Sequence, residues 1–184
     1  MADASDPVEI NDAAKAAFSF QDYTAAPRIE GVEIVDVRRF HDDGGAITEL
    51  GRLTAGAHAA LEGFEVRQFN YSEVEAGAIK AYHLHRRQTD VWYVPPCDRL
   101  LLVLHDCRAG SPTEGVTMRF VLGDSTSRLV RIPPGVAHGC RNIAATTGRI
   151  IYMVDVQFST DADCDEGRLP WDYLGAEVWE VVRG

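Results

Sequence analysis

The stretch from Leu100 to Ile132 decides the fold class, and it reads LLLVLHDCRAGSPTEGVTMRFVLGDSTSRLVRI. It holds three short apolar runs, at residues 100–105, 117–122 and 128–132, each of a length typical of strands. The pieces between them carry the turn residues Ala-Gly-Ser-Pro and Gly-Asp. No helical pattern of ten residues separates one run from the next, which argues against a parallel βαβ arrangement. The stretch therefore predicts antiparallel strands joined by turns.

The same rhythm of apolar runs and turn signals extends along the chain from residue 31 onward. Strands are expected at residues 32–37, 65–70, 78–83, 91–94, 100–105, 117–122, 128–132 and 149–158. Many short strands at regular spacing are typical of a β-sandwich or barrel. We therefore expect a single barrel domain over residues 28–184, with the tail at 169–182 packed outside it as a short strand or helix. Residues 1–27 are expected to be loosely ordered, with a short helix at 10–20 capped by Asn11 or Asp12.

Composition narrows the class of protein. The 184 residues suffice for one domain with a real core, and 46% hydrophobic with 25% charged residues is usual for a soluble globular protein. No window reaches 18 uninterrupted apolar residues, and residues 1–20 lack the apolar core of a secretion signal, so we expect no membrane partner. The net charge of −10 disfavours nucleic acid. The four cysteines form no Cys-x-x-Cys motif, and we expect reduced thiols in the cytoplasm.

Two patches that carry histidines are candidates for chemistry. In AIKAYHLHRRQTD, residues 78–90, His83 and His85 are two positions apart and would share one face of a strand. In IPPGVAHG, residues 132–139, two prolines and two glycines form a stiff turn that presents His138 at the start of a strand. A lone histidine is usually an ordinary hydrogen-bonding side chain. Three histidines in this arrangement favour a functional site.

Five pieces of the chain together carry a resemblance to a known family. They are VRQFNYS (66–72), GAIKAYH (77–83), RAGSPTEG (108–115), IPPGVAHG (132–139) and IY (151–152). In order and spacing the chain resembles the dTDP-4-dehydrorhamnose 3,5-epimerase family over roughly residues 32–172. The resemblance implies an all-β fold, an antiparallel cupin-like jelly-roll β-barrel that is normally dimeric and free of metal. It also implies epimerisation at C3 and C5 of a nucleotide-linked 4-keto sugar.

The resemblance assigns roles to individual residues. The family's base falls on His83 and its acid on Tyr152. A C–H beside a ketone is acidic because its carbanion is an enolate, and a neutral histidine is a suitable base near pH 7. The residues that match the family's sugar site are Gln68, Asn70, Ser72, Lys80 and His138. We thus expect a nucleoside diphosphate sugar as ligand, no cofactor, and a homodimer that exchanges a segment of the N-terminal half, including residues 32–37.

Four positions depart from the family pattern. The family arginine that holds the diphosphate aligns with Gly44, and a second arginine aligns with Lys80, which keeps the charge but loses the bidentate fork. The family lysine that stabilises the enolate oxygen aligns with Asp90, whose charge opposes a developing anion. The family base is oriented by a C-terminal aspartate, for which LPWDYLG (169–175) offers no certain equivalent. These departures leave open which sugar and nucleotide are used and whether C3, C5, both or neither is epimerised.

The same residues allow two other functions. His83, His85, Asp90 and His138 also resemble the metal-binding motifs of cupin enzymes, which would hold a divalent transition metal such as Fe(II), Mn(II), Ni(II) or Zn(II). A non-catalytic sugar-nucleotide binder would keep the fold and the pocket without the reaction.

Other features near the patches have simpler expectations. Arg86 and Arg87 either meet phosphate or lie in a solvated loop. Trp92 and Tyr93 are expected as one core and one surface residue of a strand. The acidic run at residues 161–166 is expected to be a solvated turn, since it lacks the glycine and closing glutamate of a calcium loop. Lys80, within an apolar strand, needs a polar partner.

Overall fold

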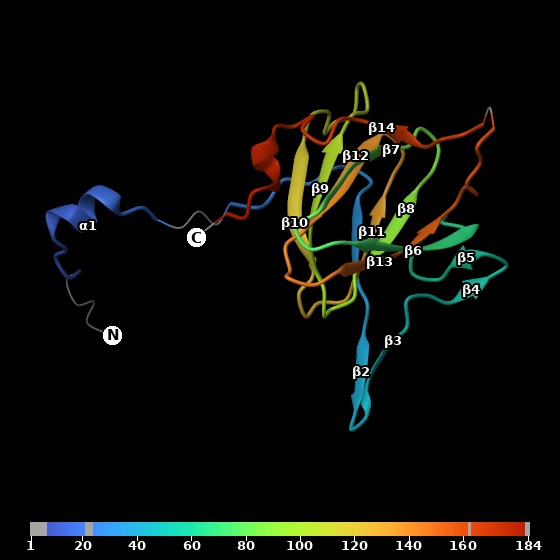
Figure 1. The fold of residues 1–184 in the computed structure, drawn as a ribbon, viewed down its shortest axis with the longest axis horizontal. Helices are drawn as coiled ribbons and strands as arrows, with labels where there is room; N and C mark the ends of the chain where they lie inside the picture. The colour runs from blue at the N-terminus through green and yellow to red at the C-terminus, as the bar shows by residue number, and fades with distance from the viewer. Residues whose placement is uncertain (1–6, 21–23, 162, 183–184) are drawn as a thin grey trace, which may run out of the picture.

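The computed structural model describes residues 7–20, 24–161 and 163–182, and in them the chain forms two facing five-stranded sheets (Figure 1). The strands of the first sheet are β1 (Glu33–Asp36), β6 (Gln68–Val74), β8 (Asp90–Tyr93), β11 (Arg128–Ile132) and β13 (Gly148–Val154). Those of the second are β7 (Ile79–Leu84), β9 (Arg99–Asp106), β10 (Thr117–Gly123), β12 (Val136–Asn142) and β14 (Gly167–Arg168).

Every pairing within the two sheets is antiparallel. The first sheet has the strand order β1-β11-β8-β13-β6, and the second has the order β10-β9-β12-β7-β14. Apart from β9 and β10, which are consecutive, neighbouring strands are not consecutive along the chain, as in a jelly roll. The predicted all-β, antiparallel jelly-roll class is therefore confirmed.

Strand β9 shows why the apolar runs of this chain are continuous rather than alternating. Leu100, Leu102 and Leu104 point into the barrel and are at most 1% exposed. Val103 points the other way and is covered by Trp179 and its neighbours from the tail. Because both faces of the strand are buried, both sets of positions are apolar.

Trp92 and Tyr93 on β8 are both buried, at 6% and 5% exposed, so the expectation of one core and one surface residue is wrong. Trp92 belongs to the barrel core, whereas Tyr93 packs on the opposite face of the sheet against Leu61 and Phe64. The segment that precedes β6 covers this outer face, and covering of that kind cannot be read from the strand's own sequence.

The Arg-Ala-Gly-Ser-Pro-Thr motif forms a hydrogen-bonded loop at the end of β9. The carboxylate of Asp106 accepts hydrogen bonds from the Arg108 guanidinium and from the hydroxyls of Ser111 and Thr113. The bond from Arg108 is the main cause that holds the pKa of Asp106 well below its usual range. Arg108 also donates to the carbonyl of Glu30, and Thr113 accepts from the Glu30 amide. The motif thus ties the segment that leads into β1 to the second sheet.

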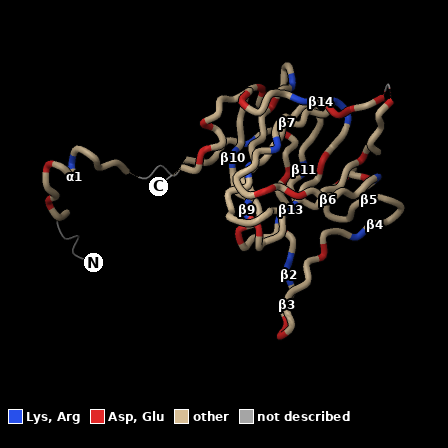
Figure 2. Tube along the Cα trace, viewed as in Figure 1, with Lys and Arg blue, Asp and Glu red and all other residues tan. Residues whose placement is uncertain are grey.

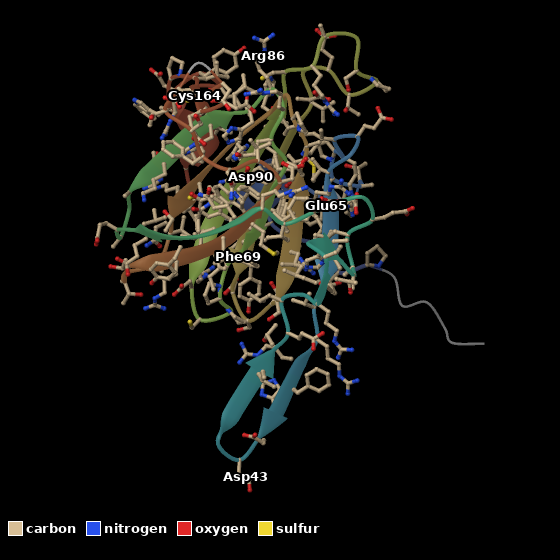
Figure 3. All side chains as sticks on the ribbon, turned by 90° about the vertical axis from the view of Figure 1, so that its right-hand side faces the viewer. Asp43, Glu65, Phe69, Arg86, Asp90 and Cys164 are labelled. Carbon is tan, nitrogen blue, oxygen red and sulfur yellow. The ribbon has the colours of Figure 1, made fainter. Side chains whose placement is uncertain are left out.

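Two small hairpins stand outside the sheets. The first, β2 (Arg39–Asp42) with β3 (Gly45–Thr48), forms an arm that projects from the barrel with Asp43 at its tip (Figures 1 and 3). Its strands are short and largely exposed, and each carries one large apolar residue, Phe40 or Ile47, so the sequence does not predict them. The second hairpin, β4 (Leu53–Thr54) with β5 (Ala57–His58), lies in the segment before β6.

The two ends of the chain differ in how they meet the barrel. Helix α1 (Asp12–Ala17) begins at Asn11, whose side chain accepts from the Ala14 amide, so the predicted helix is present but shorter. It is exposed throughout and lies apart from the barrel (Figure 1). Residues 1–6 and 21–23 of the segment expected to be loosely ordered lie outside the described part of the chain. Among the described helices, none is long and apolar enough to cross a membrane.

The tail packs on the outer face of the second sheet, as predicted. It follows β14 at the edge of the sheet and contains a 3-10 helix, η1 (Ala176–Trp179). Trp179 is 1% exposed, its ring centroid lies 5.2 Å from that of Tyr82, and its indole N–H donates to the carbonyl of Trp171.

Candidate active site

A cavity of about 450 Å³ opens between the two sheets, and most of the predicted site residues line it. Its walls come from β6, β7, β8, β13 and the residues at β14. The lining residues are Ser72, Ile79, Lys80, Ala81, His83, His85, Gln88, Asp90, Trp92, Ile150, Tyr152, Glu166 and Arg168. Figure 3 shows Asp90 within the barrel, with Arg86 and Cys164 at one end of it.

A β-bulge in β7 brings Lys80 and His83 to the same cavity although they are three positions apart. His138 on β12 is opposite His83, whereas Cys140 is opposite Lys80, so two steps on β12 match three on β7. A bulge of this kind re-aims a side chain. Gly139 makes the close approach possible, because a Cβ there would lie 2.4 Å from that of Ala81. This explains the glycine after His138.

The three histidines form one cluster at the inner wall of the cavity. The rings of His83 and His138 are stacked, with centroids 5.8 Å apart and an interplanar angle of 14°. His85 lies 6.3 Å from His83 and 5.5 Å from His138 by ring centroids. His138 is 2% exposed, does not line the cavity surface, and donates from Nδ1 to the carbonyl of Val136. His138 thus supports the ring of His83 from beneath.

His83 is held neutral, and a carboxylate faces it. Burial, followed by the charges of His138 and Arg168, lowers the pKa of His83 to about 3. Its Nδ1 lies 3.9 Å from Oε2 of Glu166. A carboxylate in this position orients a histidine ring and stabilises the imidazolium that forms when the ring takes a proton. The sequence predicted no such carboxylate, because the acidic run that holds Glu166 was expected to be a solvated turn.

The acidic run is built into the site, so its expected role as a solvated turn is wrong for Asp165 and Glu166. The carboxylate of Asp165 accepts from the backbone amides of Arg86, Arg87 and Gln88, at 2.8 to 3.0 Å. Its carbonyl accepts from Nδ1 of His85 at 2.6 Å. These bonds fix the loop after β7. A signal was present in the sequence, since acidic side chains are natural partners for the free amides of a tight loop.

Asp90 is a buried carboxylate with a full set of donors. Its oxygens accept from the Gln88 amide at 2.8 Å and from the Trp92 indole N–H at 3.1 Å, and Nε2 of His138 lies 3.4 Å away. Burial alone would raise the pKa of Asp90, but the bonds and charges of His138, His85 and Gln88 outweigh it and lower that pKa to about 2. Asp90 is therefore charged, and its oxygens are occupied by contacts with Gln88, Trp92 and His138.

The predicted metal set does not come together as one group. Among the described residues, the ligand atoms that lie within 4.8 Å of one another form two overlapping triads, His83 with His85 and Glu166, and His85 with Asp90 and His138. In the buried triad, the amide nitrogen of Gln88 lies 2.8 Å from Asp90 and 3.4 Å from Nε2 of His85. The Gln88 side chain thus supplies the hydrogen-bond donor that Asp90 and His85 need. This arrangement does not favour a metal ion between them.

Tyr152 faces the histidines from the opposite sheet. On β13 it is paired with Trp92 of β8 and Asn70 of β6, and its ring centroid lies 6.3 Å from that of Trp92. Burial, then the charges of Asp90 and Glu166, raises the pKa of Tyr152 above its usual value. The hydroxyl is therefore protonated near neutral pH and can donate.

The three predicted sugar-site residues of β6 share one face of the strand, but only Ser72 lines the cavity. Gln68 donates to Asn70 at 2.7 Å and accepts from the amide of Phe158. Lys80 finds the polar partner that its setting requires, because its ammonium donates to Ser72 at 3.1 Å. Gln68 and Asn70 thus continue the same wall beyond the cavity.

Arg86 and Arg87 are exposed and lie in the loop that Asp165 holds. Arg87 donates to the carbonyl of Asp163, whereas both arginines, with Cys164, border a shallow hollow at the surface. Gly44, where the family has an arginine, sits in the turn of the β2–β3 arm, and its amide is held by Asp42.

Known proteins share both the sequence and the fold. The chain is 37% identical to the spore coat polysaccharide biosynthesis protein SpsL of Bacillus subtilis over 144 residues, which cover 78% of this chain and 91% of that protein. It is 28% identical to the probable low-salt glycan biosynthesis epimerase Agl13 of Haloferax volcanii, over 79% of this chain and 90% of that one.

Solved structures agree with these relatives. The crystal structure of dTDP-4-dehydrorhamnose 3,5-epimerase from Bacillus anthracis, with TDP and PPi bound, superposes with a TM-score of 0.67 at 28% identity, covering 86% of this chain and 91% of that one. A dTDP sugar isomerase from Desulfovibrio desulfuricans gives a TM-score of 0.70 at 26% identity, covering 79% and 88%.

A family model described as dTDP-4-dehydrorhamnose 3,5-epimerase matches residues 26–173, which is most of the chain. The match includes every strand of the barrel and every residue that lines the cavity. The predicted resemblance is thus confirmed, and with it the prediction of an enzyme of the nucleotide-sugar epimerase type. The chain belongs to the dTDP-4-dehydrorhamnose 3,5-epimerase family.

Proposed function

We propose that this protein epimerises a nucleotide-linked 4-keto sugar, with His83 as the base and Tyr152 as the acid. The observation that supports this most is the pairing of a neutral histidine and a protonated tyrosine across one cavity, each carried by a different sheet. Epimerisation needs this arrangement, because a proton leaves from one face of the sugar and another arrives at the opposite face.

The proposed reaction balances with the residues at hand. His83 removes the proton from the carbon beside the ketone, and the electron pair of that C–H bond forms the enolate. Glu166, 3.9 Å from Nδ1, stabilises the resulting imidazolium. Tyr152 then donates its hydroxyl proton to the other face of the carbon, and solvent restores both side chains. No cofactor is needed in this scheme, since only protons move.

The ligand is proposed from the relatives and from the walls of the cavity. The Bacillus anthracis relative holds TDP and PPi, which supports a thymidine diphosphate sugar here as well. Lys80 and Ser72 supply a cation and a hydroxyl to the cavity, and Gln68 and Asn70 extend that wall. His138 acts from beneath by fixing the ring of His83.

We also propose that the protein forms a homodimer and that it is located in the cytoplasm. Each subunit would contribute one barrel domain, residues 28–184. The arm exposes Phe40 at 48% and Ile47 at 69%, and the outer face of β6 exposes Phe69 and Tyr71 at 59% each. Such surfaces are more apolar than a lone barrel needs and suit contact with a second copy. The four cysteines are free thiols, which suits a reducing compartment. Ile47→Asp should convert dimer to monomer in light scattering, whereas a wild-type monomer would contradict the dimer.

Proton exchange tests the reaction directly. In deuterated water, wild-type protein should introduce deuterium at C3, C5 or both of a thymidine diphosphate-linked 4-keto-6-deoxy sugar, read by NMR. Tyr152→Phe should keep part of this exchange but lose inversion, because proton removal precedes donation from the other face.

A second variant separates this reaction from that of a metal enzyme. His85→Asn should lower the exchange rate only slightly if the protein is an epimerase, and should abolish activity if His85 binds a metal. Metal analysis of the purified protein tests the same alternative. Absence of exchange on every such sugar would leave the binder function in its place.

A further inference from the structure

The negative charge that develops on the enolate oxygen needs a cation nearby. In the family a lysine supplies this cation, but the residue at the matching position of this chain cannot do so. Asp90 stands where the family has a lysine, and its carboxylate is charged and engaged with Trp92, Gln88 and His138. A negative group near the ketone would raise the barrier, because negative charge develops on the oxygen as the proton leaves. Another cation must therefore take the role if the proposed reaction occurs.

Lys80 is one of two permanently charged cations that line the cavity, and it is already engaged. Its ammonium donates to Ser72 at 3.1 Å, at the edge where β6 and β7 approach. In the sheet it is opposite Cys140, three positions from the base along β7, and its charge acts on the Cys140 thiol. This location suits a contact to a polar group of the ligand at some distance from the reacting carbon.

Arg168 is the other cation, and it lies directly across from the base. In the pairing of β14 with β7, Arg168 is the partner of His83. Gly167 permits this approach, because a Cβ there would lie 2.3 Å from the carbonyl of Leu84. Figure 2 shows the positive charge carried by β14 at the edge of the barrel. Within the described residues, the Arg168 guanidinium makes no hydrogen bond or ion pair, so its donors are available to a ligand in the cavity.

The charge of Arg168 acts on both proposed proton-transfer groups. Burial leads the lowering of the His83 pKa, and Arg168 adds to it. Burial also leads the raising of the Tyr152 pKa, and Arg168 acts against it. The base and the acid both act on the carbon beside the ketone. A cation close enough to influence both groups is therefore well located to contact the ketone oxygen. Glu166, two positions earlier, faces His83 from the same segment.

We propose that Arg168 donates to the ketone oxygen of the substrate and stabilises the enolate, in place of the family's lysine. The proposal rests on the epimerase function proposed above. When His83 takes the proton from the carbon, the electron pair moves into a C=C bond and the ketone oxygen becomes the anion that Arg168 holds. When Tyr152 returns a proton to the carbon, the ketone re-forms and the contact weakens. Residues 166–168 thus supply both a carboxylate for the base and a cation for the oxygen.

The test compares Arg168→Met with Lys80→Met, and uses Arg99→Met as the matched control. Arg99 is paired with Asp124 on the surface, and it takes no part in the cavity. Each variant is measured for deuterium exchange on the thymidine diphosphate-linked 4-keto sugar and for dTDP affinity by calorimetry. We expect Arg168→Met to lower kcat for exchange about 10²–10³-fold, as loss of one oxyanion donor does. KM and the dTDP Kd should stay within about threefold, and Arg168→Lys should restore part of kcat.

Two results would overturn this assignment. If Arg168→Met exchanges at the wild-type kcat, Arg168 does not stabilise the enolate. If it loses dTDP affinity while kcat is kept, the guanidinium binds diphosphate instead. Thermal unfolding of each variant shows that the fold is intact, which is expected because Arg168 is exposed. Failure of the function itself looks different, since the wild-type protein would then show no exchange on these sugars.

Discussion

The interior of the barrel has two regions that the same strands build in opposite ways. The leucine core, made by Leu100, Leu102, Leu104 and Leu122, is apolar and almost fully buried. The histidine cluster, extended here to include Asp90 with His83, His85 and His138, is polar, and its members other than His83 are nearly as buried. The two regions meet where His138 on β12 pairs with Leu104 on β9.

Burial has different energetic effects in the two regions. In the leucine core, removal of apolar surface from water stabilises the fold by roughly 25 cal/mol per Å². In the histidine cluster, burial costs free energy unless every polar atom finds a partner, and it shifts pKa values instead. The leucine core thus supplies stability, and the histidine cluster uses a rigid frame to hold a neutral base. Four predictions test this separation.

The largest effect is expected from His83→Asn. Proton exchange on a 4-keto nucleotide sugar should fall about 10²–10⁴-fold, because the general base is lost. The free energy of unfolding should change little, since His83 belongs to the histidine cluster and its side chain is 25% exposed. Exchange by NMR and urea unfolding on the same sample measure both quantities. A variant that exchanges normally would remove His83 from the mechanism.

Leu102→Ala should show the reverse pattern. We expect a loss of about 2–5 kcal/mol in the free energy of unfolding, because a cavity forms among packed side chains. Well below the unfolding temperature, the exchange rate of the remaining folded protein should stay near that of the wild type. Leu53→Ala is the matched control, since Leu53 is 43% exposed and its loss leaves no cavity in the core. Equal destabilisation by both variants would contradict the prediction.

Trp92→Phe tests the border between the two regions. The ring keeps most of its packing in the core, but Asp90 loses the indole donor at 3.1 Å. A buried carboxylate that lacks one donor should cost about 1–3 kcal/mol of unfolding free energy. Urea unfolding measures this, and Trp92→Phe combined with Asp90→Asn should recover part of the loss. Additive effects of the two substitutions would show that the indole does not support Asp90.

The fourth prediction concerns how the stability of the fold depends on pH. The pKa of His83 is lowered from 6.5 to about 3 in the folded protein, so between these pH values the unfolded chain binds more protons. Unfolding free energy should therefore fall as pH decreases from about 6.5 toward 3, with a slope of at most about 1.4 kcal/mol per pH unit from this group. His83→Asn should flatten the slope. An unchanged slope would mean that His83 titrates normally.

The sequence was most informative where local chemistry decides the structure. It identified the antiparallel class, the turns, and strands such as 128–132, because apolar runs and Gly, Pro and Asp signals act over a few residues. It also named His83, Lys80, Ser72 and Tyr152, all of which line one cavity. It missed the strands of the arm, which carry one large apolar residue each and therefore no core pattern.

What the sequence by itself determined is the fold class, the family and the kinds of side chain available for proton transfer. Only the tertiary structure decided which of them meet. Glu166 and Arg168 lie more than 80 positions from His83 along the chain, and the β14–β7 pairing and the bonds of Asp165 bring them to it. The burial of Tyr93 depends in the same way on Leu61 and Phe64 from another segment. Such contacts depend on closing long loops against a packed core, and no local propensity encodes that closure.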